Sequence, residues 1–183
     1  RPMPLSFAID FVMNGKKHRC LYAGHGQSKI VFRLLDEPKV LKLTLTVDHE
    51  PYASRLLALR CSAEQPAVKI CPRVHAIGRC DEFAWLDVPC GKPIRQWFAW
   101  LAETATPLDK YIQEMTADRK GCMKLALYKQ SVAAQHGLLL SDNNLFNFGV
   151  VDNTVVIIDL GRRVLQRHPI SKGTLNREAI YPW

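Results

Sequence analysis

Residues 136–147 read His-Gly-Leu-Leu-Leu-Ser-Asp-Asn-Asn-Leu-Phe-Asn, and residues 159–161 read Asp-Leu-Gly. Between them, apolar residues flank the turn Asp152-Asn153, which predicts a β-hairpin with strands over 143–151 and 154–159. Taken alone, acidic turns are common and are more often structural than functional. Here the second strand is an apolar run that ends in Asp-Leu-Gly, and the predicted helix before the first motif ends in His-Gly. The combination indicates a functional site rather than two ordinary turns.

These two motifs resemble the catalytic loop and the Asp-Phe-Gly motif of the protein-kinase superfamily. The family's catalytic loop reads like His-Gly-Ile-Ile-His-Arg-Asp-Leu-Lys-Pro-Glu-Asn and is followed by a short hairpin. The resemblance implies that Asp142 is the catalytic residue that positions the acceptor hydroxyl. It also implies that Asn147 and Asp159 bind Mg²⁺ on the phosphates of ATP, with Mn²⁺ as an alternative, and that Asp159 is catalytic. Leu160 stands where the family has Phe.

The chemistry accounts for this set of residues. Phosphoryl transfer depends mainly on positioning the reactants and on neutralising phosphate charge. Carboxylate and amide oxygens are hard ligands of the kind that Mg²⁺ prefers. The predicted hairpin would bring Asp159 back beside Asn147, so that both could reach one metal ion.

Residues 24–32, Gly-His-Gly-Gln-Ser-Lys-Ile-Val-Phe, resemble the family's glycine-rich loop, with Lys at the position of the third glycine. Glycines allow backbone amides to approach phosphates without an intervening side chain. A simple hairpin turn would explain the two glycines equally well. The resemblance implies nucleotide contacts from the following residues: Gly24, Gly26, Ser28, Lys29 and Val31.

Residues 40–43, Val-Leu-Lys-Leu, resemble the strand that carries the catalytic lysine of kinases. A lysine on an apolar strand is costly unless its charge is paired or reaches a phosphate. The resemblance implies that Lys42 holds the α- and β-phosphates. Glu50 is the candidate ion-pair partner of Lys42, with Asp48 and Glu64 as alternatives. A glutamate at a helix N-terminus can also simply favour the helix dipole.

Residues 82–94 resemble the last strand of the kinase N-lobe and the hinge that follows it. Backbone groups near Asp87 and Val88 would then face adenine. The fold class implied is α+β, a two-lobed protein-kinase-like fold with a small β-rich N-lobe and a reduced helical C-lobe. The expected boundaries are 1–88 for the N-lobe, 89–93 for the hinge and 94–183 for the C-lobe.

Hydrophobic periodicity predicts a strand-rich first half and a helix-rich second half. The predicted strands before residue 90 are 5–13, 29–35, 39–46, 73–78 and 82–88, and residues 20–23 lead into the glycine-rich segment. The predicted helices are 51–60, 94–101, 108–115 and 119–135. Turns are expected at Asn14-Gly15 and at 36–38.

Three departures from the family pattern bear on function. Leu140-Ser141 replaces His-Arg, which removes the docking partner of a phosphorylated activation segment. Asn144 replaces a lysine that would neutralise phosphate charge. Only twenty-two residues follow Gly161, so the segments that bind a protein substrate in full-length kinases are not expected. The chain therefore resembles reduced kinases found among bacterial effectors. We expect a cytosolic environment, with secretion into a host cell as one form of it.

The composition limits the kinds of binding partner that we expect for this chain. The 183 residues carry a formal net charge of +8, which suits an anionic partner such as ATP. The basic residues do not cluster with aromatic ones, so nucleic acid is not expected. No apolar run is long enough to span a membrane. The six cysteines do not form metal-binding spacings, and reduced thiols are favoured over disulfides.

Three functions remain open on the sequence alone. The first is an ATP-dependent protein kinase of the Ser/Thr rather than Tyr type, which we expect to be a monomer. Its substrate would be a protein, and a host protein is one candidate. The second is a small-molecule phosphotransferase of the aminoglycoside or choline kinase type, which the positive charge disfavours. The third is a catalytically inert pseudokinase that acts as an interaction module.

Overall fold

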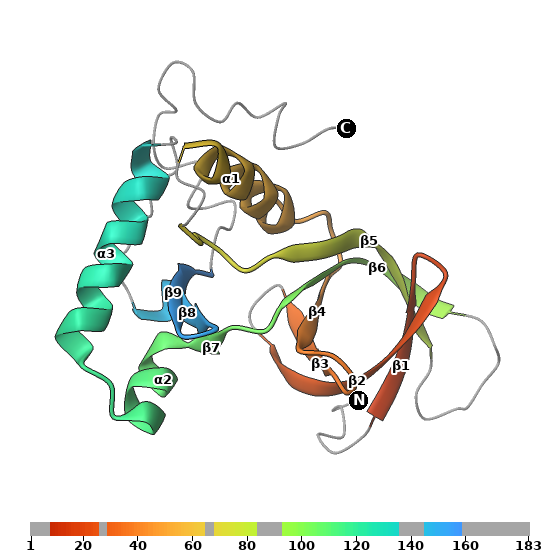
Figure 1. Ribbon diagram of the computed structural model, residues 1–183. Helices are drawn as coiled ribbons and strands as arrows, with labels where there is room; N and C mark the ends of the chain where they lie inside the picture. The colour runs from red at the N-terminus through yellow and green to blue at the C-terminus, as the bar shows by residue number, and fades with distance from the viewer. Residues whose placement is uncertain (1–7, 26–28, 65–67, 84–92, 136–144, 159–183) are drawn as a thin grey trace. The chain divides into compact units, whose positions relative to one another are not determined.

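The computed structural model describes residues 8–25, 29–64, 68–83, 93–135 and 145–158 (Figure 1). They form a mixed α/β protein with a β-rich N-terminal region and a few helices. The chain divides into two compact units. Unit 1 comprises Arg1–Asp48 and Val74–Thr104, and unit 2 comprises His49–Arg73 and Ala105–Trp183.

Unit 1 is a closed antiparallel barrel with the strand order β1-β2-β3-β4-β6-β5 (Figure 1). Its strands are β1 (Ala8–Met13), β2 (Lys16–His25), β3 (Ile30–Leu34), β4 (Lys39–Thr44), β5 (Val74–Phe83) and β6 (Pro93–Glu103). The pairing of Val12 with Asp81 and of Met13 with Cys80 closes the barrel. Because side chains alternate along each strand, one set fills the barrel and the other faces outward.

The barrel core consists of the inward-facing apolar side chains. Trp97 is its largest member, and Phe11 and Phe32 are fully buried beside each other, with the centroids of their phenyl rings 4.7 Å apart. The β1–β2 turn has Asn14 and Gly15 at φ values of 51° and 77°. Such angles favour Asn and Gly, so the turn predicted there is confirmed.

Residues 94–101, predicted as a helix, form part of strand β6, and that prediction is wrong. Strand β6 pairs with β4 on one side and β5 on the other. Its residues 97–102 are all buried, so the strand shows no alternation of apolar and polar residues. A run buried on both faces cannot be told from a buried helix by its periodicity.

The other predictions for this region are largely confirmed. Strands β1, β3 and β4 match the predicted strands within the described residues. Strand β2, at Lys16–His25, was not predicted as a strand, and β5 is one strand where two were expected, at 73–78 and 82–88. The predicted hinge at 89–93 lies outside the described residues except for Pro93, which begins β6. The chain enters unit 2 after Asp48, returns to unit 1 at Val74 and enters unit 2 again after Thr104.

Unit 2 combines three helices with a three-stranded sheet. The helices are α1 (Glu50–Glu64), α2 (Leu108–Met115) and α3 (Arg119–Gln135), and a short 3₁₀ helix, η1, spans Leu145–Asn147. The sheet has the order β7-β8-β9, with β7 at Thr106–Pro107, β8 at Phe148–Val151 and β9 at Thr154–Ile157. The predicted helices at 108–115 and 119–135 and the predicted hairpin around Asp152-Asn153 are confirmed.

The core of unit 2 joins α1 to the hairpin and to α3. Leu57 of α1, Val132 of α3 and Ile157 of β9 belong to one buried cluster. The backbone N–H of Ile157 also donates to the Ile70 carbonyl at 2.9 Å. Helix α1, which was expected in the N-lobe, therefore belongs to unit 2.

The described cysteines form no disulfide bond with one another. Cys20, Cys61, Cys71 and Cys80 are buried and Cys122 is half-buried, whereas Cys90 lies outside the described residues. Among the helices that the structure describes, none is both long and apolar enough to cross a membrane.

Candidate functional site

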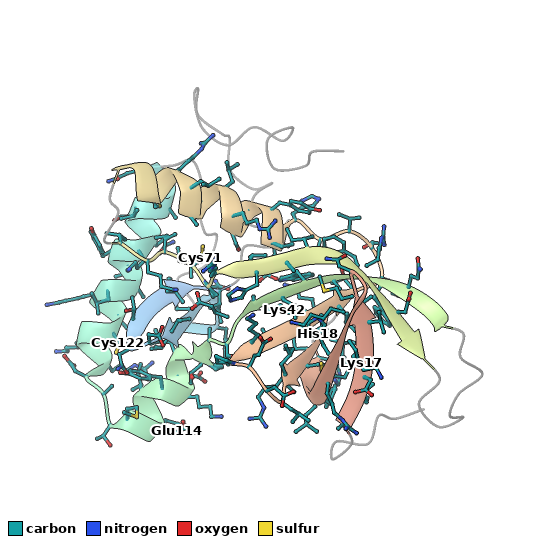
Figure 2. The ribbon with its side chains drawn as sticks, turned by 45° about the vertical axis from the view of Figure 1, so that its right-hand side comes forward. Lys17, His18, Lys42, Cys71, Glu114 and Cys122 are labelled. Carbon is teal, nitrogen blue, oxygen red and sulfur yellow. The ribbon has the colours of Figure 1, made fainter. Side chains whose placement is uncertain are left out.

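Lys42 lies on β4 with its side chain directed away from the barrel core (Figure 2). Its neighbours Leu41 and Leu43 are buried in the core, and the alternation of the strand turns Lys42 to the opposite face. Cross-strand pairing sets Lys42 between Val31 of β3 and Trp100 of β6. Lys42 is half-buried on this face.

Two lysines converge on the Trp100 indole. The Lys42 Nζ lies 5.9 Å and the Lys29 Nζ 5.7 Å from the ring centroid. Trp100 is only 1% exposed, and its ring lies 5.7 Å from that of Phe98 between centroids. Each ammonium–indole contact stabilises by about 0.5–1 kcal/mol at an exposed site. The indole therefore holds two positive charges on the outer face of the barrel, an arrangement suited to a phosphate.

The glycine-rich segment is described in part. Gly24 and Val31 are paired between β2 and β3, and the register shifts between Tyr22 and Gly24. A Cβ atom added at Gly24 would meet nothing within 4 Å, so packing does not require a glycine there. The backbone is therefore open to approach by a ligand. Gly26 and Ser28 lie outside the described residues.

Asn147 ends η1 and precedes the β8–β9 hairpin. The backbone N–H of Ile158 donates to the Asn147 carbonyl at 2.9 Å, and Phe148 pairs with Ile157. The second strand thus returns to the backbone of Asn147. Asp159 follows Ile158 directly in the sequence, but Asp142 and Asp159 lie outside the described residues. Their predicted roles stay predictions.

Glu50 is the first residue of α1 and is only 3% exposed. A carboxylate in the first turn of a helix is favoured by the helix dipole. Glu50 belongs to unit 2 and Lys42 to unit 1, so their predicted ion pair stays a prediction. Asp87 and Val88, expected near adenine, lie outside the described residues.

Trp100 was missed by sequence reasoning. Its position beside Lys42 follows from the pairing of β4 with β6, and residues 94–101 had been predicted as a helix. The sequence alone shows only that Trp97 and Trp100 lie three residues apart, which is also a helical spacing. Recognising β6 as a strand would have been needed to find the site.

Among the described residues, no group of three or more His, Cys, Asp or Glu side chains could hold a metal ion. The predicted metal site involves Asp159, which is outside that part of the chain. Asn147, the other expected ligand, is half-buried at the start of the hairpin. An amide oxygen there is chemically suited to Mg²⁺.

No family model matches this sequence, and no curated protein matches it either. Among solved structures, the chain is similar to the kinase domain of PknI from M. tuberculosis, with a TM-score of 0.44 and 12% sequence identity. That match covers 94% of this chain and 64% of the PknI domain. WbdD, crystallised with the kinase inhibitor LY294002, gives a TM-score of 0.44 at 15% identity, covering 77% of this chain and 32% of WbdD. The chain thus spans less than two thirds of either structure.

Proposed function

We propose that this chain binds ATP with Mg²⁺ and transfers a phosphoryl group to a protein Ser or Thr hydroxyl. The observation that carries the proposal is the convergence of Lys29 and Lys42 on Trp100. Lysine is a compact point charge and a common phosphate ligand in proteins. Two such charges held by one buried ring, next to a glycine-containing strand end, suit the phosphates of a nucleotide.

The metal and the acceptor are assigned to unit 2. Asn147 and Asp159 would hold Mg²⁺, and Asp142 would orient the acceptor hydroxyl. The hydrogen bond between Ile158 and Asn147 supports this assignment, because it brings the residue before Asp159 against Asn147. When bound, the metal would neutralise charge on the transferred phosphoryl group.

Adenine recognition has two candidate segments. Asp87 and Val88 are the first. The second is the segment at Thr104, which follows β6 directly, and β6 is the strand that pairs with the Lys42 strand. Amide hydrogen exchange with and without a non-hydrolysable ATP analogue distinguishes them, since backbone contacts to adenine slow exchange in one segment only.

The acceptor class and the compartment are inferred from charge and thiol chemistry. A net charge of +8 opposes a cationic small-molecule substrate and favours a protein acceptor. The free described thiols support a reducing, cytosolic environment, that of a host cell included.

Calorimetric titration with Mg²⁺ and ATP tests nucleotide binding. We expect Lys42→Met and Lys29→Met each to raise the Kd for ATP about tenfold, as loss of a charged contact does. Lys17→Met is the matched control, because Lys17 is an exposed lysine of the same barrel, 3.9 Å from Asp10. Equal effects of the three substitutions, or no binding to the unmodified chain, would refute the proposal.

A further inference from the structure

A cavity of about 290 Å³ opens at one end of the barrel in unit 1. This end carries the β1–β2 turn, the β3–β4 turn and the start of β5. The end of β2 at His25 and the start of β3 at Ile30 lie at the other end, because β2 runs from Lys16 to His25. Lys29, Lys42 and Trp100 do not line the cavity. It is therefore separate from the candidate nucleotide site.

The floor of the cavity is apolar. Met13, Ala76 and Leu101 line it, and Met13 and Leu101 also belong to the barrel core. His18 points inward with Cys20 on β2 and is only 7% exposed, so a buried imidazole lies beside this apolar floor. Binding pockets commonly combine an apolar lining with a few convergent polar groups, and barrel mouths are frequent places for them.

The rim of the cavity is positively charged. Lys16 and Lys39 both line it, against a single carboxylate, Glu37. Glu37 Oε1 lies 3.5 Å from Lys39 Nζ, so this carboxylate is engaged by one of the two lysines. His75 adds a second imidazole. The charges that line the cavity therefore favour an anion over a cation.

We propose that the mouth of the barrel binds a small organic anion, a carboxylate or a phosphate monoester with a short apolar body. The anionic group is held by Lys16, with His18 as the inner hydrogen-bond partner. The apolar body rests on Met13 and Leu101. The volume lies close to the lower limit for ligand pockets, which suits a ligand smaller than a nucleotide.

A metal ion is a poorer occupant of this cavity. Two imidazoles and one carboxylate line it, but in the described part of the chain no set of three such groups is arranged to hold a metal. The two lysines would also repel a cation. A small amine is disfavoured for the same reason.

The direct test follows the ring resonances of His18 and His75 by NMR during titration with phenylphosphate and, separately, benzoate. Both probes carry an apolar ring, and they distinguish the phosphate from the carboxylate source. We expect at least one of them to shift both histidine rings. Inorganic phosphate is expected to bind more weakly than phenylphosphate, because it cannot use the apolar floor, and benzylamine is expected to leave the rings unshifted.

Lys16→Gln and Lys17→Gln form a matched pair of variants. The two lysines are adjacent on β2 and exposed, but the alternation of the strand places Lys16 on the same face as His18 and Lys17 on the opposite face. Figure 2 labels Lys17 and His18. We expect Lys16→Gln to raise the Kd of the bound probe about tenfold, and Lys17→Gln to change it less than about twofold.

Several results overturn the proposal. In the titration, these are histidine resonances that do not shift with either organic anion at about 10 mM, binding of benzylamine, or inorganic phosphate that binds as tightly as phenylphosphate. In the variants, it is an equal loss of probe affinity in Lys16→Gln and Lys17→Gln. None of these results bears on ATP binding, which Lys42→Met tests separately.

Discussion

At the scale of the residue, Gly24 has space around it for a larger side chain. A Cβ atom there would have no neighbour within 4 Å, and φ is not in the left-handed region. Gly24→Ala is therefore expected to leave the thermal midpoint unchanged within about 2 °C. If backbone amides of this segment approach phosphate, the added methyl group weakens ATP binding several-fold, which calorimetry measures. An unchanged ATP affinity would remove Gly24 from the nucleotide site.

His18 gives the barrel a pH-dependent stability. Burial lowers the pKa of His18 below its usual 6.5, Lys16 and Lys39 lower it further, and Glu37 opposes them. The unfolded chain therefore binds more protons than the folded one as the pH falls through 6.5, and the free energy of unfolding decreases.

Denaturant unfolding at about pH 7.5 and about pH 5.5 measures this effect. We expect His18→Gln to lose less stability between the two pH values than the unmodified chain does. An equal or larger loss in the variant would show that His18 does not resist protonation in the folded state.

At the scale of the element, β8 approaches β7 at Gly149. A Cβ atom at Gly149 would lie 2.9 Å from the Thr106 carbonyl oxygen and 3.0 Å from Ile158 Cγ2. The carbonyl belongs to backbone paired with β8, so it cannot move freely.

Gly149→Ala is accordingly expected to destabilise unit 2 by about 1–3 kcal/mol in chemical denaturation. Gly24→Ala serves as the control, because it makes the same change of residue where there is space. Stability equal to that of the control would show that the contact between β7 and β8 is looser than described.

The elements with local signals were predictable. Asn14-Gly15 and Asp152-Asn153 take the positive φ values that tight hairpin turns need, and these residue types tolerate them. Strand β6 was not predictable, because the pairing that buries both of its faces comes from strands distant in the sequence. Lys42 and Asn147 could be proposed because each lies in a local sequence motif. Trp100 could not, because its place beside Lys42 depends on the register between strands that are distant in the sequence.

At the scale of the whole molecule, burial determines which cysteine thiols can react. Burial, reinforced by Asp10, raises the pKa of the Cys20 thiol to about 12, so Cys20 is not a nucleophile at neutral pH. In a Cys90→Ser variant, we expect a thiol reagent to label Cys122 first and the four buried cysteines only on unfolding. Peptide mass mapping determines the order in which the cysteines are labelled. Early labelling of Cys20 would show that the barrel opens readily.

The units have separate cores, and the proposed reaction needs groups from both. In the proposed reaction, Lys29 and Lys42 would come from unit 1, and Asp142, Asn147 and Asp159 would come from the sequence range of unit 2. Nucleotide binding alone would not distinguish an enzyme from an inert kinase-like module. Transfer of phosphate does distinguish them.

The decisive measurement is intact-mass and label analysis after incubation with Mg²⁺, labelled ATP and a cell lysate. We predict labelled protein bands and the added mass of phosphate. Both are lost in Asp142→Ala and Asp159→Ala but kept in the control Asp36→Ala, which removes an exposed carboxylate between β3 and β4. Full transfer by either of the first two variants, or none by the unmodified chain, would contradict it.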